Sequence, residues 1–246
     1  MANLDARKSG AFKIVGEILI HRLGFGSMRI TGPGIWGPPA DRAEALRTLR
    51  RLLELGIDFV DTANSYGPDV SEELIKEVLQ PYRRMLIATK AGFRRPQSRQ
   101  VGNRWRPCLS PAKRRSGAAR SSAWSRSGSG NCIASIRRSR RDEQFAAIRS
   151  MLDDRMIRHA GLSEVSVADI KAASKVFGVA TVQNRYNLLN RGSEDVLDYC
   201  ETHGIGFIPW FPSPGLNSVS INLCTLLTFS IATTSLVCLT SRTCIR

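Results

Sequence analysis

The order of apolar runs and amphipathic stretches is the feature that most limits how this chain can fold. Between residues 11 and 92, and again between 141 and 212, short apolar runs typical of buried strands alternate with segments whose leucines and isoleucines recur at helical spacing. Strands that alternate with helices form parallel sheets. Because no Gly-x-Gly-x-x-Gly follows a strand, we expect a (β/α)8 barrel rather than a doubly wound sheet, formed as a single domain over residues 1–246.

The pattern predicts fewer strands than a complete barrel contains. Apolar runs predict a hairpin and six strands, at residues 12–23, 22–28, 57–60, 85–89, 157–163, 179–183 and 205–210. Helical spacing predicts five helices, opened by Asp41 in a capping-box pattern, by Ser71, near residue 145, by Ser166 and by Ser193. A barrel needs eight strands. We therefore expect an incomplete α/β barrel in which strands 1–3 and 5–7 are recognisable and strands 4 and 8 are missing or scrambled.

Residues 93–140 form an atypical basic segment. The 14 Lys and Arg between Arg94 and Arg141 account for nearly all of the net charge of +15, and no Asp or Glu lies among them. We expect this segment to be disordered, because it is rich in Arg, Ser, Gly and Pro and shows neither helical nor strand periodicity. One alternative is a nucleic-acid-binding insertion in which Trp105 and Trp124 stack on bases. No known module spacing is present, so we expect no nucleic-acid partner.

Residues 213–246 form an atypical apolar tail that lacks Asp, Glu and Lys. Many Ser and Thr interrupt its apolar run, so we expect no membrane partner. The six cysteines show no metal-ligand spacing, and the chain shows no signal peptide. We therefore expect free thiols, no metal site and a cytoplasmic location.

Three side chains that suit acid catalysis follow two neighbouring predicted strands. Asp61 and Tyr66 come after the apolar run that ends at Val60, and Lys90 follows the run that begins at Met85. The carboxyl ends of parallel strands meet at one end of a barrel, so these side chains are expected to lie together. An ammonium beside a tyrosine lowers the pKa of the phenol, and a buried carboxylate can hold that ammonium in place. The spacing predicts the proton-donating half of a carbonyl reductase.

Several short motifs resemble the aldo-keto reductases, in the bacterial branch related to the potassium-channel β-subunit and pyridoxal-reductase groups. The resemblance covers residues 11–92 and 141–212. Its most specific segments are Leu23-Gly24-Phe25-Gly26-Ser27-Met28-Arg29, residues 61–67, Thr89-Lys90, His159-Ala160-Gly161-Leu162-Ser163, Val182-Gln183-Asn184 and Pro209-Trp210-Phe211-Pro212.

The resemblance implies an NADPH-dependent oxidoreductase that reduces an aldehyde or ketone to an alcohol. In that family, hydride leaves the nicotinamide for a small-molecule carbonyl substrate while a tyrosine protonates the developing alkoxide. By position, the implied catalytic residues are Tyr66 as the acid, Lys90 as the group that lowers its pKa and Asp61 as the partner that orients Lys90. The implied cofactor-binding residues are Gly26, Ser27, Asp61, Ser163, Gln183 and Trp210, and Trp36 would line the substrate pocket.

The chain departs from the family pattern at three places. Glu164 stands where many relatives have an Asn, which weakens the contact with the nicotinamide carboxamide. The Leu-His pair that ends the family's fourth strand is absent, and a phosphate-binding loop is missing after Pro212. We therefore expect impaired or absent turnover. The alternative is a non-catalytic relative that binds the nicotinamide cofactor through Ser163, Gln183 and Trp210. The oligomeric state and the choice of carbonyl substrate stay open.

A frameshift is our hypothesis for both gaps: residues from about 94 to 140 are read out of frame. With GC-rich codons assigned, the bases that encode residues 122–136 can be read, two positions on, as Leu-Glu-Pro-Glu-Arg-Ile-Gly-Glu-Leu-Tyr-Arg-Leu-His. That text ends in the missing pair. A second shift near Pro212 would explain the tail, and the family's sequence would then be truncated at that point.

Overall fold

The computed structural model describes residues 5–82, 85–91, 93–94, 106–107, 130–135, 141–211 and 236–238. Its strands are β1 (Ala11–Ile14), β2 (Ile18–His21), β3 (Leu23–Gly26), β4 (Phe59–Asp61), β5 (Leu86–Ala91), β6 (Phe93–Arg94), β7 (Arg106–Pro107), β8 (Gly130–Ser135), β9 (His159–Ser163), β10 (Val179–Arg185), β11 (Gly206–Trp210) and β12 (Leu236–Cys238). Its helices are α1 (Arg42–Glu54), α2 (Val70–Leu79), α5 (Arg141–Asp153), α6 (Val167–Ser174) and α7 (Glu194–Thr202), with short 3-10 helices η1 (Ala6–Ser9), η2 (Ser27–Ile30) and η3 (Pro33–Ile35).

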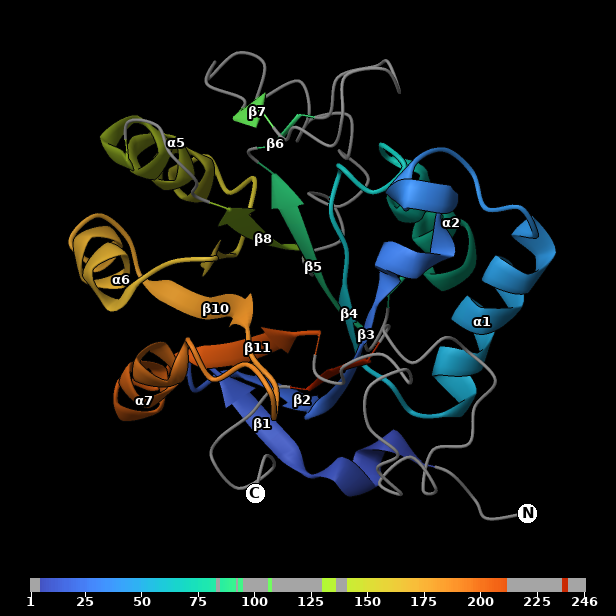
Figure 1. Ribbon diagram of the computed structural model, residues 1–246, viewed down its shortest axis with the longest axis horizontal. Coiled ribbons are helices and arrows are strands. Elements are labelled where there is room, and N and C mark those ends of the chain that lie inside the picture. Colours follow the sequence, from blue (N-terminus) through green and yellow to red (C-terminus); the bar gives the residue numbers. More distant parts are fainter. Residues whose placement is uncertain are drawn as a thin grey trace.

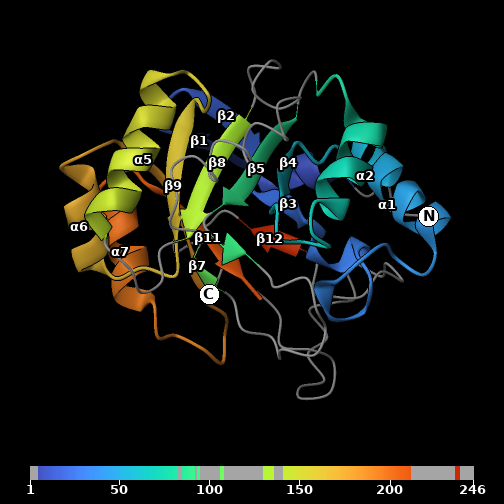
Figure 2. The same cartoon turned by 90° about the horizontal axis from the view of Figure 1, so that it is seen from above.

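A sheet of eight strands forms the centre of the molecule (Figure 1). Its order is β11-β10-β9-β8-β5-β4-β3-β12, and neighbours from β3 to β11 are parallel. Helices α1 and α2 lie on one side of the strands and α5, α6 and α7 on the other (Figure 2). The six expected strands and the α/β architecture are present.

The fourth and eighth places of the sheet differ from a regular barrel in different ways. The fourth place holds Gly130–Ser135, which pairs in parallel with β5 and β9 although it lies inside the segment expected to be disordered. Without it, both neighbours would present unpaired backbone groups at an open edge. At the eighth place β12 pairs with β3 antiparallel, whereas a barrel strand would be parallel. The expectations for the rest of residues 93–140 and 213–246 concern residues outside the described ranges, apart from the short β6–β7 pair.

The apolar side chains separate into two outer clusters and one inner cluster. One outer cluster packs α1 and α2 against β3, β4 and β5, and the other packs α5, α6 and α7 against β9, β10 and β11. The inner cluster joins the β1–β2 hairpin to the inside of the barrel, and it contains Ile14, Ile20, Phe59, Leu86, Ala88, Ala180 and Ile208. The hairpin is fixed by Asp58, whose carboxylate accepts bonds from the backbone N–H of His21 at 2.9 Å and lies 2.7 Å from its ring. The β1–β2 hairpin closes the amino end of the barrel, so the site lies at the carboxyl end.

Two helices begin with a side-chain cap at the residue expected from the sequence, whereas Ser193 precedes α7 without a side-chain cap bond. Asp41 accepts a bond from Glu44 N at 2.8 Å, and Ser166 forms a reciprocal capping box with Asp169. The second helix begins at Val70 after Asp69, which lies at φ 65°, so the expectation that Ser71 opens it is wrong. The Ser71 side chain is turned inward and is engaged elsewhere, as described below.

Candidate functional site

The buried ion pair between Lys90 and Asp61 is the centre of the site. Strands β4 and β5 are parallel neighbours, and they deliver these two residues to the same end of the barrel. Lys90 Nζ lies 2.6 Å from both Oδ1 and Oδ2 of Asp61, and the two side chains are only 11% and 6% exposed. Burial lowers the pKa of Lys90, but the Asp61 carboxylate, together with Tyr66, raises it by more, so that the net pKa is above its ordinary value. Lys90 is therefore an ammonium held in a fixed place.

Tyr66 lies beside this ammonium. Lys90 Nζ is 5.3 Å from the centroid of the Tyr66 ring. Burial raises the pKa of Tyr66 more than the charge of Lys90 lowers it. The expected net lowering of that pKa is therefore not what the structure gives, because desolvation of the phenolate outweighs the cation. The phenol keeps its proton at neutral pH, which is the form that a proton donor needs.

Backbone bonds hold the segment between Asp61 and Gly67 over the site. Thr62 N donates to Ala88 O at 2.8 Å, and Asn64 N donates to Lys90 O at 3.2 Å. The turn that carries Tyr66 ends at Gly67, which lies at φ +100°, and a Cβ there would meet Val70 Cβ at 2.4 Å. Gly67 also accepts a bond from Gly37 N at 2.8 Å, which places the loop of Trp36 beside the Tyr66 turn. Trp36 is half-buried there.

A buried hydroxyl network supports the same end of the barrel. Ser27 Oγ donates to Asp61 O at 2.9 Å, and Ser71 Oγ lies 2.7 Å from Ser27 Oγ and 2.9 Å from Thr62 Oγ1. All three hydroxyl-bearing residues are fully buried. The Ser27 side chain therefore holds the backbone of Asp61 in place. Gly26 pairs with Asp61 across β3 and β4.

Ser163 and Gln183 come from the other half of the barrel. They are register partners on β9 and β10, and both are buried. Gln183 Nε2 is buried and has no hydrogen-bond partner among the described residues. An unpaired buried amide donor is costly unless a ligand completes it. This pair therefore suits a ligand that carries a carbonyl or carboxamide oxygen.

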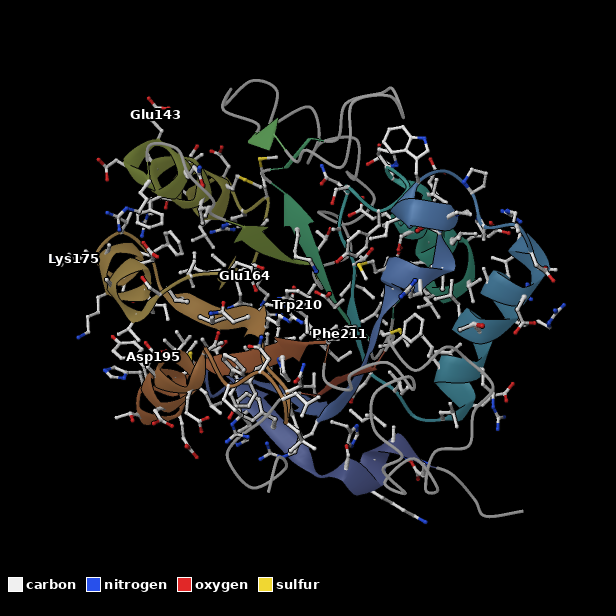
Figure 3. All side chains as sticks on the ribbon, viewed as in Figure 1. Glu143, Glu164, Lys175, Asp195, Trp210 and Phe211 are labelled. Carbon is white, nitrogen blue, oxygen red and sulfur yellow. The ribbon has the colours of Figure 1, made fainter. Side chains whose placement is uncertain are left out.

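Trp210 lies at the carboxyl end of β11 and is 36% exposed. Its indole N–H donates to Oε1 of Glu164, and the same oxygen accepts a bond from Arg185 N at 2.9 Å. The Arg185 guanidinium lies 5.7 Å from the Trp210 ring centroid. Figure 3 shows Glu164, Trp210 and Phe211 gathered near the centre of the molecule, whereas Glu143 and Lys175 point outward from the helices. Glu164, identified in the sequence only as a departure from the family, thus orients Trp210.

Two buried polar groups near the site were not predicted. Asn64 Oδ1 is buried without a hydrogen-bond partner among the described residues. Glu72 is buried beside β5, and its carboxyl is bonded by Thr89 Oγ1. A signal for Glu72 was available, because it lies on the same helical stripe as Ile75 and Leu79. No comparable signal marks Asn64.

The three histidines lie away from Tyr66. His21 is in the hairpin and pairs with Asp58, and His159 begins β9 at the opposite end of the strand from Ser163. His203 follows α7, where its ring Nδ1 lies 2.8 Å from Tyr199 O. Within the described ranges, the site therefore brings no histidine to Tyr66. Those ranges also hold no group of metal-ligating side chains and no helix long and apolar enough to cross a membrane.

Cys200 is the cysteine whose side chain the structure describes. It is a free thiol on the buried face of α7, and burial raises its pKa to about 12. The side chains of the other five cysteines lie outside the described part of the chain. Cys200 is therefore inert packing rather than a nucleophile.

Two relatives share the sequence over most of the chain. An uncharacterized oxidoreductase of Schizosaccharomyces pombe (strain 972 / ATCC 24843) is 44% identical over 218 residues, which are 85% of this chain and 68% of that protein. Pyridoxine 4-dehydrogenase of Escherichia coli (strain K12) is 32% identical over 216 residues, which are 82% of this chain and 72% of that protein.

Solved structures share the fold. A glycerol dehydrogenase from Gluconobacter oxydans matches with a TM-score of 0.71 and 25% identity, over 82% of this chain and 63% of that one. An aldo/keto reductase from Klebsiella pneumoniae in complex with NADP and acetate matches with a TM-score of 0.61 and 18% identity, over 80% of this chain and 66% of that one. This chain thus spans about two thirds of the length of these proteins.

The family model described as "Aldo/keto reductase family" matches residues 22–215. That match contains the strands that carry Asp61, Lys90, Ser163 and Gln183 and the turn that carries Tyr66. This chain belongs to the aldo/keto reductase family.

Proposed function

We propose that the protein is built to reduce an aldehyde or ketone to an alcohol with NADPH, with Tyr66 as the proton donor. The observation that carries the proposal is the buried Lys90–Asp61 pair, which fixes an ammonium beside the Tyr66 ring. The phenol is protonated at neutral pH because its pKa is raised by burial. It can therefore give its proton to a developing alkoxide, and the adjacent ammonium stabilises the phenolate that results.

The described residues fit a nicotinamide. NADPH supplies a hydride when it is bound. The unpaired Nε2 of buried Gln183, with Ser163 beside it, could hold a carboxamide oxygen, and the half-exposed ring of Trp210 offers a stacking face. The NADP complex of the Klebsiella relative supports the choice of cofactor. The free thiol of Cys200 and the need for NADPH favour a cytoplasmic location.

The substrate class follows from the site and from one relative. Trp36 lies at the mouth beside the Tyr66 turn, where it would give the substrate an aromatic wall. The Escherichia coli relative is a pyridoxine dehydrogenase, which favours a small aromatic alcohol or aldehyde. Pyridoxine and simple aromatic aldehydes are therefore the first compounds to test.

We expect turnover to be impaired, because no histidine of the described residues reaches Tyr66 to help orient the carbonyl. The frameshift hypothesis accounts for the missing histidine. The position of β8 supports the hypothesis, because Gly130–Ser135 lies within residues 122–136, whose bases contain a fourth strand in the alternative reading. Genomic sequencing across the codons for residues 90–145 and 205–246 tests it. A single family-like frame restored by inserted or deleted bases would support the hypothesis, and an unchanged reading would contradict it.

A second candidate is cofactor binding without catalysis. The specific observation is that Gln183, Ser163 and Trp210 are complete while the carbonyl-orienting histidine is not present among the described residues. Calorimetric titration with NADPH and a turnover assay on aromatic aldehydes distinguish the two. Binding with turnover that is lost in Tyr66→Phe supports the reductase. Binding without turnover supports the second candidate, and no binding contradicts both.

A further inference from the structure

Glu72 is a buried carboxyl that the proposed proton transfer does not use. It lies in the first turn of α2 and is 6% exposed. Thr89 Oγ1 donates a hydrogen bond to Glu72 Oε1, and Thr89 itself is buried. A carboxyl removed from water destabilises the fold, since an apolar side chain would pack the same helix face without this desolvation cost. The cost directs attention to what the carboxyl contacts.

The next residue along β5 is Lys90. Successive side chains of a strand point to opposite faces of a sheet, so Thr89 faces α2 while Lys90 faces Asp61. The end of β5 is therefore held from outside the barrel by Glu72 and from inside by Asp61. Rotation of the strand about its axis would break both contacts at once.

The neighbouring residue of the same helical turn holds the other two strand ends. Ser71 Oγ bonds to Ser27 and to Thr62, and Ser27 in turn donates to Asp61 O. The first turn of α2 thus contacts the chain at the ends of β3, β4 and β5. It is placed to set the geometry between Asp61 and Lys90.

We propose that Glu72 is a positioning residue for Lys90, which it acts upon through Thr89. The inference rests on the proposed function only where a test measures kcat. Glu72 touches neither Tyr66 nor a reacting atom.

The charge of Glu72 gives the proposal a signature that packing alone would not have. Burial raises the pKa of Glu72 to about 7, the Thr89 hydrogen bond and the Lys90 charge lower it, and the Asp69 charge raises it. Tyr82, in the turn after α2, is the other titratable group that senses this carboxyl. Asp69, Lys90 and Tyr82 are thus the charged and titratable groups that interact with this carboxyl among the described residues. The carboxyl therefore changes its charge near neutral pH, within reach of the ammonium of Lys90.

The first test compares Glu72→Gln with the control Glu73→Gln, whose side chain is exposed on the same turn. Glutamine keeps the acceptor for Thr89 but cannot ionise. We expect kcat of the unmodified chain to change about threefold or more between about pH 6 and about pH 8. That change should disappear in Glu72→Gln and stay in Glu73→Gln, while KM is unaffected. An unchanged pH profile in Glu72→Gln overturns the proposal.

The second test breaks the link itself. Thr89→Val removes the hydroxyl, whereas Thr89→Ser retains it. We expect Thr89→Val to lower kcat about tenfold, because a small displacement of Lys90 disturbs the proton donor, and we expect Thr89→Ser to restore most of it. Equal kcat in the two variants overturns the proposal.

The third test needs no turnover. A carboxyl carbon-13 titration of labelled protein, assigned with Glu72→Gln, should show Glu72 titrating near neutral pH, and Lys90→Met should raise that midpoint by about half a pH unit or more. Lys90→Arg, which keeps the charge, should leave the midpoint in place and controls for repacking. A chain that lacks turnover counts against the proposed reductase, and this titration then decides the inference alone. A midpoint near the ordinary value, or one that ignores Lys90→Met, overturns it.

Discussion

Lys90 Nζ lies 2.6 Å from each carboxylate oxygen of Asp61, in a pair whose two side chains are almost fully removed from water. A buried ion pair contributes little net stability compared with apolar residues, but its geometry is fixed because neither partner can be left alone. The ion pair therefore adds little to the stability of the fold, but it fixes the position of an ammonium beside Tyr66.

Removing one partner of this pair should destabilise the fold. We expect Lys90→Met or Asp61→Asn to lower the free energy of unfolding by about 3 kcal/mol, since each leaves a buried group unpaired. The double variant should lose less than the sum of the two. Urea denaturation at neutral pH measures all three. Additive losses in the double variant would contradict a direct coupling.

The stability that comes from the raised pKa of Lys90 should depend on pH in one direction. It is complete below the ordinary value of 10.5 and is lost as the pH rises through the raised value of the folded state. The Lys90 contribution to the difference in unfolding free energy between the unmodified chain and Lys90→Met should therefore not shrink near neutrality and should be lost only in alkaline solution. A difference that shrinks below about pH 8 would contradict this assignment.

Tyr66→Phe should remove turnover and spare cofactor binding. The phenol donates the proton in our proposal, and a positioned acid typically contributes about a hundredfold or more to the rate. We expect kcat to fall by at least that factor while the NADPH dissociation constant changes little. Tyr199→Phe is the control, because Tyr199 lies on α7 and stacks on His203. An equal fall in both variants would show a general loss of folding.

Glu72→Gln should stabilise the fold increasingly as the pH rises from 4.5 to about 7. The unfolded chain releases this proton near the ordinary value of 4.5, whereas the folded chain holds it to about 7. The wild-type side chain therefore loses stability relative to glutamine across that window, by about 3 kcal/mol at its upper end. Urea denaturation at a series of pH values gives the difference. Glu73→Gln should show no such slope.

The sequence predicted most elements of the fold because their signals are local. The helix starts at Asp41 and Ser166 and the alternation of apolar strands with amphipathic helices are read from neighbouring residues. The position of β8 could not be predicted in this way. Its place depends on the empty edges of β5 and β9, which are features of the assembled sheet.

For the candidate site, residue types were predictable but their energetics were not. Asp61 and Lys90 meet as expected from their strands, yet the net direction of the Tyr66 pKa shift was wrong. A sequence shows that a lysine is near, but it does not show how completely the phenol is removed from water. Likewise Glu164 was identified as a departure, while its bond to Trp210 depends on two loops that meet only in the fold.

Gly67→Ala should disturb the turn that carries Tyr66. The residue lies at φ +100°, and an added Cβ would come within 2.4 Å of Val70 Cβ. Both effects oppose the native turn, so we expect a loss of about 2 kcal/mol in unfolding free energy or more, with a larger loss of turnover. Gly178→Ala is a matched control, since nothing lies within 4 Å of its Cβ position. Equal stabilities of the two variants would contradict the predicted clash.

Glu164→Ala should weaken NADPH binding by freeing the Trp210 ring. The same carboxylate oxygen accepts bonds from the Trp210 indole and from Arg185 N, so its removal leaves both donors without this acceptor. Loss of a hydrogen bond to a charged group is worth about 1.5 kcal/mol or more, which corresponds to a rise of about tenfold in the dissociation constant.

Glu164→Gln separates the acceptor from the backbone. Glu164 lies at φ 57°, a left-handed conformation that strains alanine and glutamine alike, so any difference between the two variants reports the side-chain oxygen. Glutamine keeps that oxygen and should retain most of the affinity. Calorimetric titration with NADPH measures both variants, with Glu44→Gln on α1 as a distant control. If alanine and glutamine bind equally well, Glu164 does not orient Trp210 for the cofactor, and the ring must be held by Arg185 and its neighbours instead.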